Sequence, residues 1–266
     1  MTLPFAQLSF PEQYERALVG PLFLPWADPL LDDVELAAGD RVLDVACGTG
    51  IVARLAKQRL GDTGKVVGVD LSPAMLAVAR DVAPDIDWRE GDASVLPLHD
   101  SEQFDVVVCQ QGFQFFPDKP AAARNMRRAL VPNGRLAIST WRPDDEFPVL
   151  LELRRVVERH VGAIADRRHS LGEKGPLESL LRDAGFRGVR SKTVSRTISF
   201  ADGSVFLRLN AMALIGMSAA SKDMSGEERG KIMAAIERDS ADVMRRHTDE
   251  AGFAYEFSTN VVTAKG

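Results

Sequence analysis

Apolar runs and amphipathic stretches alternate from about residue 40 to residue 200. Short apolar runs bounded by turn residues are typical of buried strands, and apolar residues every three or four positions are typical of helices packed on a sheet. The predicted strands are 41–46, 65–71, 86–93, 104–111 and 135–140. The predicted helices between them are 50–61, 73–83 and 120–130. This alternation predicts an α/β fold with a parallel sheet and crossover helices.

The pattern is less regular after residue 141. Residues 148–164 and 175–186 are amphipathic and predict helices, whereas 189–200 alternates polar and apolar residues like a strand. Residues 205–247 predict further helices, and 253–265 predicts a last strand. Because the sequence has no repeat, low-complexity tract or linker, we expect one domain of 266 residues.

Composition and charge exclude several classes of partner. The net charge of −5 gives no general attraction to nucleic acid or to anionic membranes, and neither is expected as a partner. The N-terminus lacks a basic segment followed by an apolar core, so no signal peptide is predicted, and the apolar run 17–27 is too short to span a bilayer. The two cysteines form no CxxC motif, which favours a reducing cytoplasm. A monomer or homodimer is expected.

A glycine-rich turn follows the first predicted strand, in the stretch VLDVACGTG at 42–50. Glycines at such a turn allow the backbone to approach a ligand closely. The spacing Gly48-x-Gly50-x-x-Ala53 fits both a nicotinamide dinucleotide site and an S-adenosylmethionine site. Asp70 ends the second strand, 20 residues after Gly50, and a carboxylate there accepts hydrogen bonds from both ribose hydroxyls of either ligand. These two features leave both ligands open.

Two further features favour S-adenosylmethionine. The stretch EGDASVLPL at 90–98 places Asp92 and the backbone of Ala93 where an acceptor and a donor would pair with the edge of an adenine ring. Short-chain dehydrogenases need a tyrosine and a lysine four residues apart. The only tyrosines are Tyr14 and Tyr255, and neither has a lysine at that spacing. The nicotinamide hypothesis is therefore rejected.

Five motifs in order resemble those of the class I S-adenosylmethionine-dependent methyltransferases: VLDVACGTG, VVGVDLSPAML, EGDASVLPL, FDVVVCQQGFQFFPD and ALVPNGRLAIST. The sequence is most similar to the branch that contains the ubiquinone and menaquinone C-methylases. This resemblance implies a Rossmann-like, doubly wound sheet of seven strands, the last antiparallel and inserted between strands five and six. Within the one domain we expect an N-terminal helical cap at 1–36, a cofactor-binding core at 37–143, and a C-terminal half at 144–266. The helical segment at about 205–247 matches no motif of the family, and we expect it to form a lid.

The resemblance also implies how S-adenosyl-L-methionine, and its product S-adenosyl-L-homocysteine, would be held. Asp44 would bind the methionine ammonium, Asp70 the ribose, and the backbone carbonyl of Gln110 the methionine amine. The family usually has glycine where this chain has Ala46, and we expect a shifted contact there without loss of binding. The full set of predicted cofactor-binding residues is Asp44, Ala46, Cys47, Gly48, Thr49, Gly50, Asp70, Leu71, Met75, Gly91, Asp92, Ala93 and Gln110.

The acceptor is less well defined by the sequence. The sulfonium is already activated, so alignment and exclusion of water can suffice, and no catalytic base is assigned to any of the four histidines. No cluster has metal-ligand spacing, so no metal is expected. Aromatic residues flanking the strand ends, and three methionines within 207–224, favour a small, largely apolar or aromatic acceptor. The predicted pocket residues are Phe10, Tyr14, Trp26, Gln111, Phe115 and Trp141.

Two alternatives to a small-molecule methyltransferase remain open. One is an RNA or protein methyltransferase, which the net negative charge disfavours, and the other is a cofactor-binding regulatory subunit without turnover.

Overall fold

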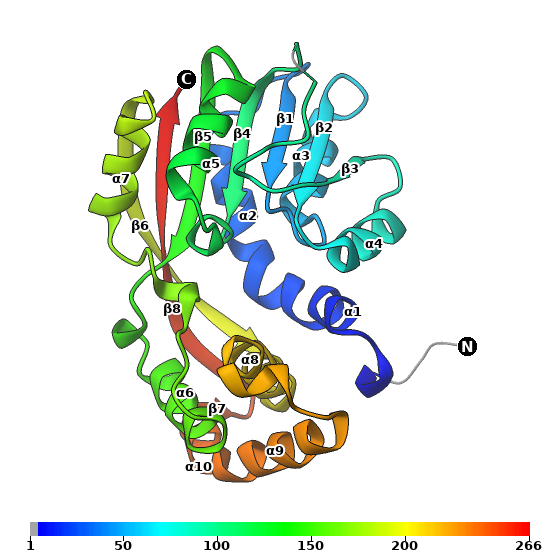
Figure 1. Ribbon diagram of the computed structural model, residues 1–266, viewed down its shortest axis with the longest axis vertical. Coiled ribbons are helices and arrows are strands. Elements are labelled where there is room, and N and C mark those ends of the chain that lie inside the picture. The colour runs from blue at the N-terminus through cyan, green and yellow to red at the C-terminus, as the bar shows by residue number, and fades with distance from the viewer. Residues whose placement is uncertain (1–4, 100) are drawn as a thin grey trace.

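A single twisted sheet organises the molecule (Figure 1). The computed structural model describes residues 5–99 and 101–266. The strand order in this part of the chain is β3-β2-β1-β4-β5-β8-β6, and β8 is antiparallel to both neighbours. The predicted doubly wound sheet with its last strand inserted next to strand five is therefore confirmed. The strands are β1 Arg41–Val45, β2 Lys65–Asp70, β3 Asp87–Glu90, β4 Phe104–Gln110, β5 Leu130–Trp141, β6 Arg187–Phe200, β7 Thr248–Asp249 and β8 Gly252–Lys265.

Helices cover both faces of the sheet and build two buried layers. Apolar residues of α2, α3 and α4 pack on one face, and those of α5 and α7 pack on the other. The bounds of the longer helices are α1 Phe10–Tyr14, η2 Glu15–Phe23, α2 Leu24–Asp33, α3 Ile51–Leu60, α4 Pro73–Val82, α5 Lys119–Ala129, α6 Pro148–Val161, α7 Lys174–Asp183, α8 Gly203–Met217, α9 Gly226–Asp239 and α10 Ala241–Arg246.

Local sequence explains where these helices begin. Ser72 caps α4 by accepting a hydrogen bond from the Met75 N–H at 3.3 Å, and Pro73 occupies the first turn, where a missing N–H has no cost. Asp118 caps α5 in the same way through the Ala121 N–H at 2.8 Å. The apolar run 17–27 lies in η2 and α2. Pro21 interrupts the backbone hydrogen bonds of η2, which has the wider turn of a π-helix.

Strands β6 and β8 extend beyond the rest of the sheet and carry a second lobe (Figure 1). Their paired extensions, 194–200 and 253–259, present alternate aromatic side chains such as Phe253, Tyr255 and Phe257 to a third buried cluster. Helices α6, α8 and α9 complete this lobe with a fourth cluster. The lobe therefore faces the carboxyl ends of β1 and β4, with α1 and η2 crossing between the two parts.

None of the helices in the described ranges is long and apolar enough to cross a bilayer.

Candidate functional site

Asp44 is a buried carboxylate at the end of β1. Its side chain is 1% exposed, and its Oδ2 accepts a hydrogen bond from the Ala53 N–H in the first turn of α3 at 3.1 Å. Burial raises the pKa of Asp44 to about 8, although the hydrogen bond from the Ala53 N–H lowers it. A buried carboxylate with one hydrogen bond is a ready partner for a cationic ligand group.

The turn after β1 adopts the left-handed backbone conformation at three positions. Gly48 has a φ of +57° and Gly50 a φ of +90°. A Cβ on Gly50 would lie 2.2 Å from Cη2 of Trp88, so glycine is required there for space as well as conformation. Ala46 has a φ of +58°, a conformation that glycine adopts with less strain. This explains physically why the related motif prefers glycine at this position.

The Gly50 contact gives a stability prediction. Gly50→Ala should lower the free energy of unfolding by about 1–3 kcal/mol, because the new methyl group overlaps Trp88. Gly230→Ala is the matched control, since Gly230 lies in the exposed middle of α9 with open space at its Cβ. The control should raise stability by about 0.5–1 kcal/mol in urea unfolding. Equal effects of the two substitutions would contradict the packing around Gly50.

Asp70, at the end of β2, holds the glycine turn in place through hydrogen bonds. Its Oδ2 accepts from the Gly48 N–H at 2.8 Å and its Oδ1 from the Ser72 N–H at 2.8 Å. Burial raises the pKa of Asp70, although both N–H groups favour the carboxylate. Each carboxylate oxygen has a second lone pair, so hydroxyl donors from a ligand can be accepted without breaking these bonds.

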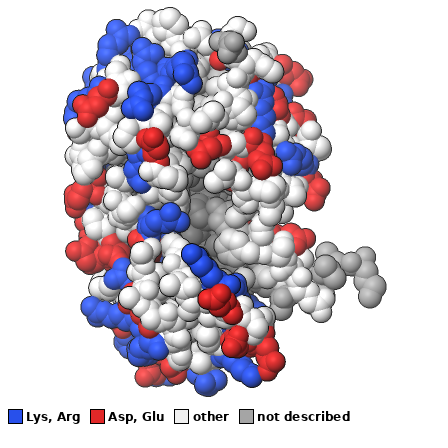
Figure 2. Space-filling view, viewed as in Figure 1, with Lys and Arg blue, Asp and Glu red and all other residues white. Residues whose placement is uncertain are grey.

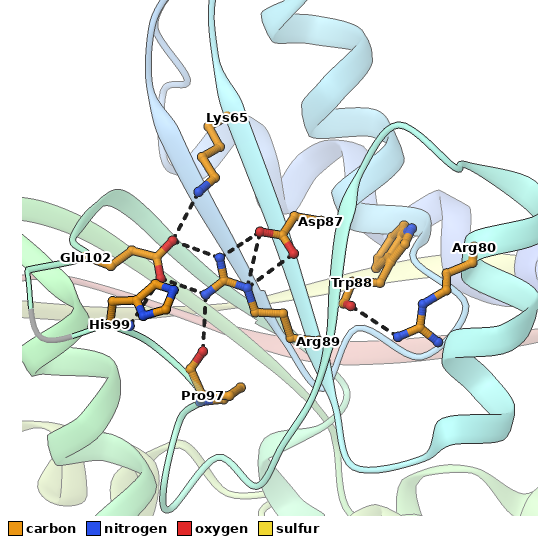
Figure 3. A network of polar contacts seen from close by, with 8 residues as sticks. All are labelled: Lys65, Arg80, Asp87, Trp88, Arg89, Pro97, His99 and Glu102. Carbon is orange, nitrogen blue, oxygen red and sulfur yellow. Dashed lines mark hydrogen bonds and ion pairs between the residues drawn. The ribbon is translucent and has the colours of Figure 1, made fainter.

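A network of ion pairs holds the segment that follows β3 (Figure 3). The Arg89 guanidinium bonds Asp87 at 2.6 Å, Glu102 at 2.6 Å and the Pro97 carbonyl at 3.1 Å. Hydrogen bonds from Arg89 lower the pKa of Glu102 to about 2, so this pairing persists through the neutral range. The network fixes the segment that carries Gly91, Asp92 and Ala93. Because Asp92 Oδ1 accepts from the Ser94 N–H at 2.7 Å, its Oδ2 remains for a ligand.

Two glutamines lie at the end of β4: Gln110 is its last residue and Gln111 follows it. Gln110 donates from Nε2 to the Phe23 carbonyl at 3.1 Å, and Gln111 donates to Thr259 Oγ1 at 2.8 Å. Gln111 has a φ of +55°, so the chain turns sharply at the strand end. The Oε1 atoms of both side chains are buried and have no partner in the described part of the chain.

Two cavities meet at these strand ends. The first cavity has a volume of about 240 Å³ and lies between the sheet and the second lobe. The second cavity, of about 340 Å³, lies over the ends of β2 and β3. They share the residues Ala46, Gly48, Gln111 and Phe115. Figure 2 shows a hollow between the two lobes with largely uncharged walls.

The second cavity contains most of the residues predicted to hold a nucleoside. Asp70 and Ser72 lie beside Leu71, which is 66% exposed and free to cover a flat ligand. The other predicted nucleoside-binding residues on its wall are Met75, Gly91, Asp92 and Ala93. The Thr49 side chain is buried, and neither Thr49 nor Gly50 lines either cavity.

The first cavity is lined by many apolar side chains, several of them aromatic. Tyr14 packs on Phe23 at a centroid distance of 4.9 Å, and Trp141 stacks on Phe257 at 4.4 Å. The wall includes the predicted pocket residues Phe10, Tyr14, Gln111, Phe115 and Trp141, together with Asp44, Cys47 and Gln110. Trp26 was predicted to line this pocket as well. It lies instead behind Trp141, edge-on at 5.8 Å, because it is on the side of α2 that faces the core.

Several cavity residues were not predicted. Phe206, Leu209 and Asn210 come from α8, and Arg168 and His169 come from the short helix η5, Arg167–His169. The sequence shows η5 only as a polar loop, and no local pattern indicates that it reaches the cavity. The His169 Nδ1 donates to the Arg142 carbonyl at 2.7 Å, which leaves Nε2 as the unprotonated acceptor. Burial lowers the pKa of His169, which favours this neutral form.

The two cysteines belong to different buried layers. The Cys47 thiol packs with the layer of α2, α3 and α4, and Cys109 with the layer on the opposite face of the sheet. Both are free thiols, and burial raises the pKa of each well above its usual value. The backbone of Cys47 is fixed as well, because its N–H donates to the Val69 carbonyl at 3.0 Å and its carbonyl accepts from the Gly50 N–H at 2.9 Å.

Within residues 5–99 and 101–266, no three histidine, cysteine or acidic side chains are grouped so that they could hold a metal ion.

Comparisons with known proteins agree with this geometry. A family model described as a methyltransferase domain matches residues 42–134. The chain is 32% identical over 190 residues to the ubiquinone/menaquinone biosynthesis C-methyltransferase UbiE of Xylella fastidiosa, which covers 63% of this chain and 75% of the relative. It is 41% identical over 116 residues to the 2-phytyl-1,4-naphtoquinone methyltransferase of Thermosynechococcus vestitus.

The latter alignment covers 42% of this chain and 51% of the relative, so the chain spans about half the length of that protein. Among solved structures, the YcgJ protein of Bacillus subtilis aligns with a TM-score of 0.57 and 18% identity, over 90% of this chain and 97% of that one. This structural likeness supports the fold.

Proposed function

The chain belongs to the class I S-adenosylmethionine-dependent methyltransferases, and from this premise we propose that it methylates a small, largely apolar or aromatic acceptor. The observation that carries the proposal is the pair of adjoining cavities, one with residues suited to a nucleoside and one with aromatic walls. A methyl donor lying across their junction would present its methyl group to the first cavity.

The residues at the junction fit S-adenosylmethionine. The left-handed turn at Gly48 leaves room for a ligand, since a Cβ there would have only the Tyr14 hydroxyl within 4 Å, at 3.9 Å. Asp70 would accept the ribose hydroxyls, and Asp92 with the Ala93 N–H would pair with the adenine edge. Asp44 would bind the ammonium group, together with the Gln110 carbonyl. Bound in this way, the cofactor supplies an already activated methyl group.

The protein's own contribution is to hold the acceptor in line and to exclude water. The aromatic pairs of the first cavity would clamp a flat acceptor, and Phe115, at the junction of the two cavities, would cover the reacting atoms. His169 Nε2 is the one histidine nitrogen of the cavity wall free to accept a proton within the described residues. No step in methyl transfer to carbon or oxygen requires a metal ion here, and none is proposed.

The relatives favour an aromatic acceptor, since two of them are named for quinone methylation. We further propose that different segments bind the two ligands. Residues 37–143 would hold the cofactor, while 1–36 and the lid at about 205–247 would enclose the acceptor. Residues 1–4 of the predicted cap lie outside the described residues. On the face shown in Figure 2 both signs of charge are interspersed, which does not favour RNA as the acceptor.

A labelling experiment tests the proposed function. The protein is incubated with S-adenosylmethionine labelled in its methyl group and, separately, with pools of aromatic small molecules, RNA and protein. We expect label in the small-molecule pool alone. Label in RNA or protein would replace the proposal with the corresponding alternative. Cofactor binding without label transfer to any pool would favour a regulatory subunit.

A further inference from the structure

Two polar residues, Asn210 of the second lobe and Arg168 of η5, meet on the wall of the first cavity. Asn210 lies on α8 and Arg168 on η5, so both are on elements other than the strand ends that carry Asp44 and Gln110. Helix α8 lies in the lower part of Figure 1, and the ends of β1 and β4 lie above it. The cavity therefore has polar groups on two walls contributed by different parts of the fold, with aromatic side chains making up much of the rest.

Hydrogen bonds fix the orientation of these two residues. Asp166, whose side chain is 2% exposed, accepts from Arg168 Nε at 2.9 Å and from Nη2 at 2.7 Å. Arg168 Nη1 donates to Asn210 Oδ1 at 2.8 Å. Because a guanidinium only donates, Asn210 must direct its oxygen toward Arg168 and its amide nitrogen away from it. The orientation of the amide is thus determined by chemistry.

The amide nitrogen of Asn210 has no partner. Asn210 is 6% exposed, and its Nδ2 is buried without an acceptor in the described part of the chain. Native proteins rarely leave such a donor unpaired, because it loses its hydrogen bonds to water on burial. Arg168 also has N–H groups beyond those bonded to Asp166 and Asn210. Asn210 and Arg168 therefore have N–H groups without a partner beside the cavity, and an occupant that carries an acceptor oxygen would pair with them.

The charges around these donors are balanced. Asp166 neutralises Arg168 through two nitrogens. The other titratable groups that line the same cavity are His169, Tyr14, Tyr255, Cys47 and Asp44. Burial lowers the pKa of His169 and raises the pKa of Cys47 and of both tyrosines, which keeps these groups neutral at pH 7. Burial also raises the pKa of Asp44 to about 8, so it is mostly neutral without a ligand, and in the loaded protein its charge would be balanced by the ligand ammonium. Without a net positive charge, the site suits an uncharged oxygen better than a carboxylate or phosphate.

We propose that Asn210 and Arg168 form an acceptor-recognition subsite that hydrogen-bonds an uncharged oxygen, a carbonyl or hydroxyl group, on an otherwise apolar acceptor. The subsite rests on the proposed function, because it orients the acceptor toward the methyl donor at the opposite end of the first cavity. An acceptor held at its oxygen by Asn210 and clamped on its faces by aromatic residues has one orientation in the cavity. Asn210 is thereby a specificity-determining residue, and Asp166 a positioning residue that acts through Arg168.

Three bicyclic probes of similar size test this subsite: α-tetralone, which carries a carbonyl oxygen, tetralin, which lacks it, and tetralin-1-carboxylate, which carries a charge. Their affinities are measured by ligand-detected NMR on protein loaded with S-adenosylhomocysteine. The wild-type protein should bind α-tetralone about tenfold more tightly than either other probe, the effect of one or two hydrogen bonds. Asn210→Asp keeps the acceptor for Arg168 but removes the donor, and should abolish this preference.

Leu209→Met is the matched control on the same helix and the same wall. It preserves volume and should change the affinities for α-tetralone and tetralin by the same factor. Asn210→Leu serves as a second variant if Asn210→Asp does not fold. It should lose the preference for α-tetralone but keep its affinity for tetralin. Equal affinity of the wild-type protein for α-tetralone and tetralin, or tighter binding of the carboxylate, overturns the subsite. Failure to bind S-adenosylhomocysteine overturns the proposed function instead.

Discussion

Asp44→Asn should weaken the binding of S-adenosylhomocysteine by about 3 kcal/mol or more, the cost of removing one partner of a buried ion pair. The variant keeps a side-chain oxygen for the Ala53 N–H, so the first turn of α3 should be retained. The loss should be confined to the amino-acid half of the ligand. 5′-Methylthioadenosine, which lacks the ammonium group, is the control ligand and should bind the variant and the wild-type protein equally. Equal weakening of both ligands in calorimetric titration would contradict the assignment of Asp44.

The same substitution should stabilise the ligand-free protein. Burial raises the pKa of Asp44 from 3.8 to about 8. A group whose pKa is raised on folding contributes fully to stability below its unfolded pKa, and this contribution is lost as the pH rises through its folded pKa. Asparagine does not titrate, so the Tm advantage of Asp44→Asn should increase from about pH 5 to about pH 8. A difference in Tm that is constant over this range would contradict the raised pKa.

Asp70→Ala is the second substitution with a large expected effect. It should weaken the binding of S-adenosylhomocysteine by about 1.5–3 kcal/mol, because hydrogen bonds to a charged partner are lost. It should also lower stability, since the Gly48 and Ser72 N–H groups lose their common acceptor. Unlike Asp44→Asn, this substitution should weaken the binding of 5′-methylthioadenosine as much as that of S-adenosylhomocysteine, because both ligands contain the ribose.

The control for Asp70→Ala is Asp145→Ala, at an exposed position between β5 and α6. This control should change neither affinity nor urea unfolding. If Asp70→Ala binds with wild-type affinity, the ribose lies elsewhere. If it loses affinity without any loss of stability, the hydrogen bonds that Asp70 accepts from the Gly48 and Ser72 N–H groups contribute nothing to the fold.

The placement of the proposed cofactor residues could be predicted because they lie at the ends of parallel strands, and these ends meet at one edge of the sheet. Asp44 lies within the apolar run 42–46 and Asp70 ends the run 66–70, so both are recognisable locally, whereas Asp92 follows the short and more polar strand β3. The hydrogen bonds that Asp70 accepts from the Gly48 and Ser72 N–H groups were not foreseen, because a ribose contact and a backbone contact have the same sequence signal. The strained conformation of Ala46 was likewise visible only in the structure.

The acceptor half could not be predicted in this way. The long strands β6 and β8 were expected, but nothing local showed that their extensions would carry a second lobe opposite the sheet. Arg168 and Asn210 are 42 residues apart and meet only through this lobe. Trp26 illustrates the opposite error, since an aromatic residue near the site can face the core as readily as the cavity.

Calorimetric titration of the wild-type protein with S-adenosylhomocysteine and with NAD tests the central claim most directly. The two cavities and the carboxylates Asp44 and Asp70 predict one-to-one binding of S-adenosylhomocysteine at micromolar affinity, and no heat of binding with NAD. Heat with NAD alone would contradict the account.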